Sequence, residues 1–107
     1  IPWYTYPAIE FLEDKVKSDF TVFEFGSGQS TLWWAERVKQ VISIESDQNW
    51  FNEITQQMPQ NVKLNLETDE QKYGNFILLY PDQYFDVIIV DGINRNGCLE
   101  KSLGKIK

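Results

Sequence analysis

Residues 23–34, FEFGSGQSTLWW, join a predicted strand to a predicted helix through a turn that holds two glycines one residue apart. The strand covers about residues 19–25, DFTVFEF, because β-branched and aromatic side chains favour extended backbone. The helix covers about residues 29–39, since its apolar side chains recur at helical spacing. This strand–turn–helix unit decides the fold, and strands and helices go on alternating along the chain.

The remaining elements extend the same pattern. Further strands are predicted over residues 40–46, 61–67 and 84–92, and further helices over residues 7–17, 48–58, 73–80 and 95–106. Strands that alternate with helices form βαβ units, in which the strands run parallel and the crossovers are right-handed. We therefore expect one α/β domain over residues 1–107, built on an open, mainly parallel sheet with helices on both faces.

The composition excludes several classes of function. The chain has 107 residues, 42% of them hydrophobic, so it can bury a core. Its net charge is −6 and no basic stripe exists, so we expect no nucleic-acid surface. The absence of histidine removes His-dependent triads and the commonest metal ligand. No apolar run is long enough to span a membrane, so no membrane contact is expected.

The cysteine and several tryptophans are expected to serve packing. Cys98 is the only cysteine, so no disulfide forms within the chain, which favours a reducing compartment and a cytoplasmic location. We expect Cys98 to be a small buried side chain rather than a nucleophile. Trp33 and Trp34 are expected to pack the helix after the turn rather than contact a ligand. Trp50 and Phe51 are expected in the core.

Residues 86–90, DVIIV, predict a strand that is buried on both faces, as the central strands of parallel sheets are. Only one predicted helix follows this strand, and an edge strand so apolar would be prone to aggregate. We therefore expect the sheet to be incomplete here, with four strands present. Either further strands follow in the intact protein, or a partner covers this edge.

The glycine turn has the features of a ligand site. It lies where a strand of a parallel sheet ends, which is the edge at which open α/β proteins bind ligands. Gly26 and Gly28 permit a ligand to approach the backbone closely. Glu45 ends the next strand, roughly 20 residues on, a spacing at which a carboxylate meets ribose hydroxyls. The pattern therefore predicts a nucleoside-containing ligand, with a purely structural turn as the alternative.

Two residues beside the turn distinguish between nucleoside ligands. Thr31 stands where a dinucleotide-binding turn has its third glycine, which allows close packing of the helix on the strand. Glu24 precedes the turn and would add negative charge beside a pyrophosphate, whereas it suits an ammonium or sulfonium group. Both residues disfavour a dinucleotide-dependent oxidoreductase.

Three segments resemble the motifs of class I (Rossmann-like) S-adenosylmethionine-dependent methyltransferases. EFGSGQS, residues 24–30, is similar to their first motif, with Ser30 in place of its last glycine. VISIESD, residues 41–47, is similar to their second strand with its ribose-binding acid, and FDVIIVDG, residues 85–92, to their fourth strand. The resemblance extends over about residues 7–105 and implies the N-terminal half of that Rossmann-like fold.

This resemblance implies a site for S-adenosylmethionine, and for its product S-adenosylhomocysteine, at the glycine turn. Gly26, Ser27 and Gly28 would line the methionine portion of the cofactor. Glu24 would hold the methionine amino group, directly or through water, and Glu45 would bind the ribose hydroxyls.

Three further positions complete the implied site. Asp69, with Glu67 nearby, is the candidate for the adenine amino group, and Tyr6 is the candidate for the methionine carboxylate. Asp91, at the end of the fourth strand, is the catalytic candidate, which would position the acceptor or remove its proton. The alternative for Asp91 is a structural cap of the turn that follows. No second cluster of acids accompanies Asp91, so no metal ligand is assigned.

We therefore expect an S-adenosylmethionine-dependent methyltransferase whose acceptor the sequence does not specify. A small-molecule acceptor is the first expectation, and a homo-oligomer is compatible with the sequence. Two alternatives stay open. One is a relative on the same scaffold that transfers an aminopropyl group, and the other is a cofactor-binding or interaction module without catalysis.

Overall fold

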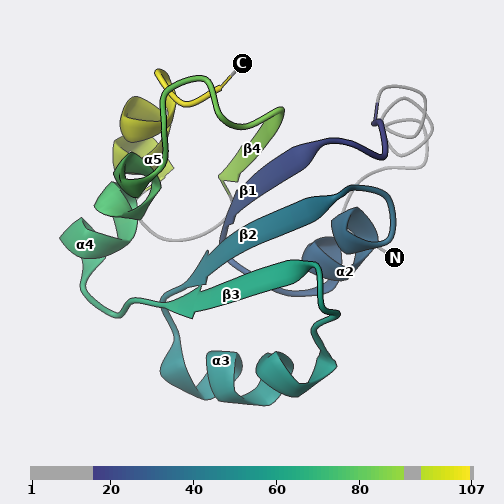
Figure 1. The fold of residues 1–107 in the computed structure, drawn as a ribbon. Helices are drawn as coiled ribbons and strands as arrows, with labels where there is room; N and C mark the ends of the chain where they lie inside the picture. The colour runs from purple at the N-terminus through teal and green to yellow at the C-terminus, as the bar shows by residue number, and fades with distance from the viewer. Residues whose placement is uncertain (1–15, 91–94, 107) are drawn as a thin grey trace.

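Four parallel strands form one sheet in the order β3-β2-β1-β4 (Figure 1). The computed structural model describes residues 16–90 and 95–106, so most of the predicted helix over residues 7–17 lies outside the described residues. The strands are β1 (Thr21–Phe25), β2 (Gln40–Glu45), β3 (Val62–Leu66) and β4 (Val87–Val90). β1 pairs with both β2 and β4, and β2 pairs with β3. The predicted open, parallel α/β sheet is confirmed.

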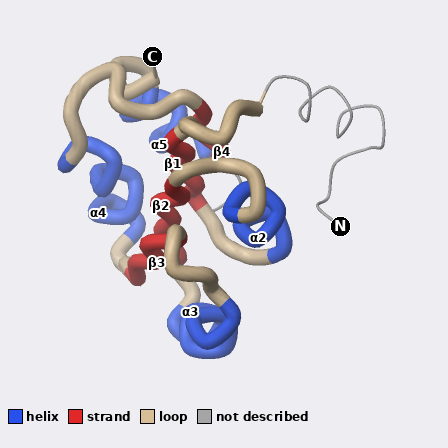
Figure 2. Tube along the Cα trace, turned by 45° about the vertical axis from the view of Figure 1, so that its right-hand side comes forward, coloured by secondary structure: helices blue, strands red, loops and turns tan. Residues whose placement is uncertain are grey.

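Helices lie on both sides of this sheet (Figure 2). The helices are α2 (Gln29–Ala35), α3 (Gln48–Ile54), α4 (Glu70–Asn75) and α5 (Arg95–Ser102), with short 3₁₀ helices η1 (Thr55–Gln57) and η2 (Phe76–Leu79). α2 covers one face, α4 and α5 cover the other, and α3 lies near the edge strand β3. Among the described residues, no helix is long and apolar enough to cross a membrane.

Several helix boundaries differ from the sequence prediction, and hydrogen bonds of the structure explain two of them. Helix α2 ends at Ala35, where the Asn61 side chain donates to the carbonyl oxygens of Ala35 (2.7 Å) and Val38 (3.1 Å). These bonds satisfy carbonyls that a longer helix would have used internally. Helix α4 begins earlier than predicted, because the Asp69 carboxylate caps its first turn by accepting the Lys72 amide (2.9 Å).

Successive residues of β1 and β2 point to opposite faces of the sheet. The face under α4 and α5 carries one buried apolar cluster, formed by Phe23, Phe25, Ile42, Ile44, Tyr73, Ile77, Phe85 and Cys98. The face under α2 carries a second, formed by Val22, Trp33, Trp34, Ala35, Val38 and Val41. The predicted packing roles of Cys98, Trp33 and Trp34 are therefore confirmed.

The face under α2 changes character toward the carboxyl ends of the strands. The register of β1 and β2 sets Glu24 opposite Ser43, and both side chains are fully buried. Glu45 follows at the end of β2 and is also buried. This polar end of an otherwise apolar layer adjoins the glycine turn.

β4 lies at an edge of the described sheet. Its register with β1 sets Ile88 beside Phe23 and Val90 beside Phe25. All four residues of β4 are half-buried, and no other strand among the described residues pairs with its free edge. That a further strand or a partner covers this edge stays a prediction.

Candidate functional site

The glycine turn connects β1 to α2 at the carboxyl edge of the sheet. Gly26 has a φ of 95°, in the left-handed region that favours glycine. Gly28 has a φ of 163°, which is extended backbone that any residue adopts. Among the described residues, a Cβ on Gly28 would meet only Trp50 Cζ2, at 3.8 Å, an ordinary contact. Gly26 is therefore required by the backbone, whereas Gly28 leaves room in front of the turn.

The three amides of the turn have partners within the protein. The Gly26 amide extends the strand ladder by donating to a carbonyl oxygen of β2 (2.8 Å). The Ser27 amide donates to Glu45 Oε1 (3.0 Å). The Gly28 amide donates to Thr31 Oγ1 (3.0 Å). A turn that cradles a phosphate presents such amides to the anion, so this turn is not arranged as a phosphate cradle.

Glu24 is buried directly behind the turn. Its carboxylate accepts hydrogen bonds from the hydroxyls of Ser30 and Thr31, and Ser43 Oγ lies 3.4 Å from its Oε1. The Thr31 hydroxyl thus donates to Glu24 and accepts from the Gly28 amide. Where a dinucleotide-binding turn has a third glycine, this chain has a side chain that links the turn to a buried acid.

Glu45 holds the turn from the end of β2. Only 7% of the residue is exposed, and its Oε2 accepts from the amides of Ser46 (3.1 Å) and Asp47 (3.0 Å). With the Ser27 amide on Oε1, the carboxylate has three donors. A carboxylate has about four acceptor positions, so about one is left for a ligand hydroxyl.

Trp50 does not lie in the core, so the prediction for this residue is wrong. The residue is 39% exposed, and its indole Nε1 donates to the Ser27 carbonyl oxygen (2.8 Å). The buried residue of α3 is Ile54 instead. Asp47 caps α3, because its Oδ1 accepts the Trp50 amide (3.0 Å). Asp47 is the sequence signal that could have predicted this position, since a cap at Asp47 places Trp50 in the first turn of α3, close to the end of β2.

The acids after β3 lie next to the Glu45 end of the sheet. The Glu67 amide donates to the Glu45 carbonyl oxygen (2.9 Å), which sets the two residues side by side. Glu67 is half-buried and its Oε2 accepts the Asp69 amide (3.1 Å). Asp69 itself is exposed and caps α4. Tyr6 and Asp91 lie outside the described residues.

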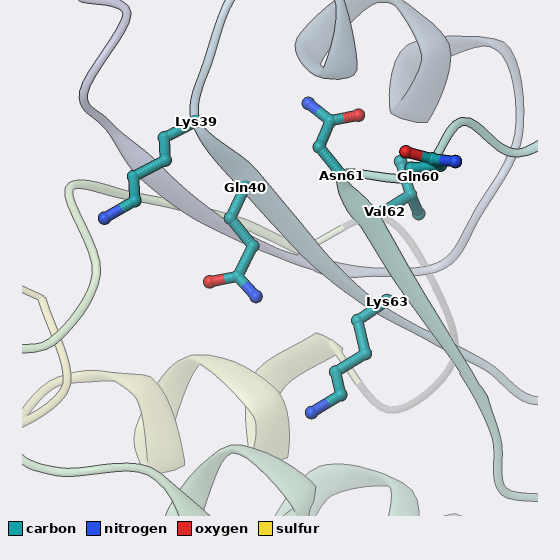
Figure 3. Close-up of a pocket in the computed structure, with 6 residues that line it drawn as sticks. All are labelled: Lys39, Gln40, Gln60, Asn61, Val62 and Lys63. Carbon is teal, nitrogen blue, oxygen red and sulfur yellow. The ribbon is translucent and has the colours of Figure 1, made fainter.

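Two hollows lie at opposite ends of the strands. One of about 260 Å³ is lined by Glu67, Lys72, Asn75, Phe76 and Leu79, at the carboxyl end of β3. The other, of about 390 Å³, is lined by Lys39, Gln40, Gln60, Asn61, Val62 and Lys63 (Figure 3). The larger hollow lies where β2 and β3 begin, on the edge away from the glycine turn. It is therefore separate from the candidate site, whereas the smaller one adjoins Glu67.

The described residues hold no group of three histidine, cysteine, aspartate or glutamate side chains that could bind a metal ion. Cys98 is fully buried. Burial, and to a lesser extent the negative charge of Glu70, raises the pKa of the Cys98 thiol to about 11. The thiol is therefore protonated at neutral pH and is not an activated nucleophile.

No protein-family model matches this sequence, and no curated protein matches it significantly. Solved structures do match its fold. A methyltransferase-like protein from Silicibacter pomeroyi superposes with a TM-score of 0.72 at 22% identity, over 97% of this chain and 68% of its own. An rRNA methylase from Streptococcus thermophilus superposes with a TM-score of 0.70 at 14% identity, over 100% of this chain and 68% of its own.

The YcgJ protein from Bacillus subtilis superposes with a TM-score of 0.68 at 14% identity, over 96% of this chain. This chain spans 47% of the YcgJ chain, which is less than half of its length. The Rossmann-like fold implied by the sequence resemblance is thus confirmed, as part of the fold of these larger proteins. At such identities the likeness establishes the fold.

Proposed function

We propose that this chain is the cofactor-binding part of an S-adenosylmethionine-dependent methyltransferase. The proposal is carried by one observation: the amides of the glycine turn are used within the protein, while two buried carboxylates, Glu24 and Glu45, flank the turn. The amides of Gly26, Ser27 and Gly28 are thus used within the protein, and the two carboxylates favour a cationic group over a phosphate beside the turn. A cofactor with a sulfonium, an ammonium and a ribose meets both conditions.

The residues around the turn fit this cofactor. Glu45 has about one acceptor position left for a ribose hydroxyl. Gly28 leaves room for the methionine portion, which Gly26 and Ser27 would also line. Glu24 is already bonded to hydroxyls and buried, so we assign it to the methionine amino group through water, with its charge acting behind the turn.

The outer parts of the proposed site are assigned on the resemblance. Asp69, next to Glu67, is the candidate for the adenine amino group, and Tyr6 for the methionine carboxylate. Asp91 is the candidate that positions the acceptor or takes up its proton. The cofactor supplies an electrophilic methyl group when bound, so the task of these residues is to hold and align the reactants.

The proposal names no acceptor. Two matching structures are an rRNA methylase and the 23S rRNA methyltransferase ErmE, the latter with a TM-score of 0.56 at 17% identity. These names give no support to the expected small-molecule acceptor. The net charge of −6 gives no support to a phosphate-binding surface on this part of the protein either.

Calorimetric titration of the intact protein tests the proposal. We expect S-adenosylmethionine and S-adenosylhomocysteine to bind, and NAD to produce no binding heat. Binding of NAD without a response to either sulfur ligand would contradict the proposal. It would indicate that the turn binds a dinucleotide instead.

A further inference from the structure

Trp50 makes contacts that the packing of the core does not explain. The residue belongs to α3, whose buried side chain is Ile54, and 39% of Trp50 is exposed. A tryptophan placed for burial alone would turn its indole ring toward the sheet. Here the indole Nε1 instead donates to the Ser27 carbonyl oxygen at 2.8 Å.

This bond completes a set of three contacts that hold Ser27. The Ser27 amide donates to Glu45 Oε1 (3.0 Å), and its hydroxyl is hydrogen-bonded to the Ser43 hydroxyl. The carbonyl oxygen is the third polar group, and Trp50 takes it. The three partners come from β2 and from the helix that follows it. The middle residue of the glycine turn is therefore fixed at every polar group by one neighbouring segment.

The Trp50 ring also borders the space that Gly28 leaves open. Its Cζ2 is 3.8 Å from the position of a Cβ on Gly28, and apart from Gly28 and its two chain neighbours no other described residue comes within 4 Å of that position. The extended backbone at Gly28 does not itself require glycine. A ligand that enters this space would pass beside the indole ring.

We infer that Trp50 is the positioning residue of the glycine turn: its indole N–H sets the orientation of the Ser27–Gly28 peptide, and its ring forms a wall of the cofactor space. The inference rests on the proposed function for the ligand, but its statement about the turn does not depend on any ligand. Because Glu45 holds the same Ser27, Trp50 also couples the turn to the ribose-binding acid.

Hydrogen exchange at the turn, measured by NMR on the ligand-free intact protein, tests the positioning role. Trp50→Phe removes the N–H donor and keeps an aromatic ring. We expect the Ser27 and Gly28 amides to exchange at least about tenfold faster in this variant, since an unpinned peptide opens more often. Trp33→Phe is the matched control, because Trp33 is a buried tryptophan of α2 that belongs to the apolar cluster of that face and whose ring lies 4.2 Å from the Arg37 guanidinium. Unchanged exchange of both turn amides in Trp50→Phe would overturn the inference.

Titration with S-adenosylhomocysteine tests whether the Trp50 ring forms a wall of the cofactor space. We expect Trp50→Phe to bind about threefold to tenfold more weakly than the wild type, the range expected for one neutral hydrogen bond. The fluorescence change on binding should be reduced in Trp50→Phe and kept in Trp33→Phe. If the wild type binds and Trp50→Phe binds equally well, the inference fails while the proposed function stands. If the wild type does not bind, the proposed function fails, and the exchange experiment alone decides the role of Trp50.

Discussion

The two faces of the β1–β2 strand pair differ in the polarity of their buried side chains. Under α4 and α5 the inward side chains are Phe23, Phe25, Ile42 and Ile44, all buried and apolar. Under α2 the same two strands begin with valines and end with buried polar residues, Glu24, Ser43 and Glu45. Burying carboxylates costs free energy that apolar packing does not. The first face therefore contributes packing without that cost, whereas the polar end of the second offsets it through hydrogen bonds of Glu24 and Glu45 within the protein.

The largest expected effect is on the apolar face. Phe23 is fully buried and makes edge-to-face contacts with Phe25 (4.8 Å) and Phe85 (5.1 Å). We expect Phe23→Ala to lower the free energy of unfolding by about 3–5 kcal/mol, measured by urea denaturation. Leu79→Ala is the control: the residue is 77% exposed, so a change within about 0.5 kcal/mol is expected. An equal small effect of both would mean that this face is not the main source of stability.

A smaller loss of stability is expected when the hydrogen bonds of Glu24, at the polar end of the α2 face, are removed. Glu24→Ala leaves the hydroxyls of Ser30 and Thr31 without their buried acceptor. We expect the free energy of unfolding to fall by about 2–3 kcal/mol in urea denaturation. Glu24→Gln keeps the volume and an acceptor, so it should cost less and isolates the contribution of the charge. Full stability of Glu24→Ala would show that the hydroxyls find other partners, and would remove the structural link between Glu24 and the turn.

The difference between the two faces also explains what the sequence could predict. The pattern of apolar side chains predicts where the strands lie and that they are buried, because this pattern is a property of the local sequence. The contacts of Glu24 with Ser43 depend on the register of β1 with β2, which no local pattern specifies. Helical spacing places Trp50 among the apolar positions of its helix, but such spacing does not specify which neighbour the side chain contacts. Motif spacing is enough to find the turn and Glu45. The hydrogen bonds that Ser27 makes with Glu45 and Trp50 can be seen only in the folded structure.

The next effect is measured on ligand binding. We expect Glu45→Ala to weaken binding of S-adenosylhomocysteine by at least about 1.5 kcal/mol, the lower range for a hydrogen bond to a charged group. Glu53→Ala is the matched control, since Glu53 is an exposed acid of the nearby helix α3 to which no role in the site is assigned. That variant should stay within about 0.5 kcal/mol of wild-type stability and keep the wild-type dissociation constant. A wild-type dissociation constant in Glu45→Ala would remove Glu45 from the site.

The smallest effect concerns Cys98 and is absent at neutral pH. Burial among apolar side chains, with Glu70 as the lesser cause, raises the pKa of the thiol from 9.0 to about 11. The folded state thus keeps the proton longer than the unfolded state does. Stability is unaffected below about pH 9, and it falls between pH 9 and pH 11 because ionisation of the thiol stabilises only the unfolded chain.

At pH 10 this linkage amounts to about 1 kcal/mol, since one pKa unit corresponds to about 1.4 kcal/mol. Urea denaturation at pH 7.5 and pH 10 measures it, with Cys98→Ala as the reference because lysines and tyrosines also titrate in this range. We expect the wild type to lose about 1 kcal/mol more than Cys98→Ala over this interval. Equal losses would mean that the Cys98 thiol ionises normally in the folded protein, and that the apolar face is open to water at α5.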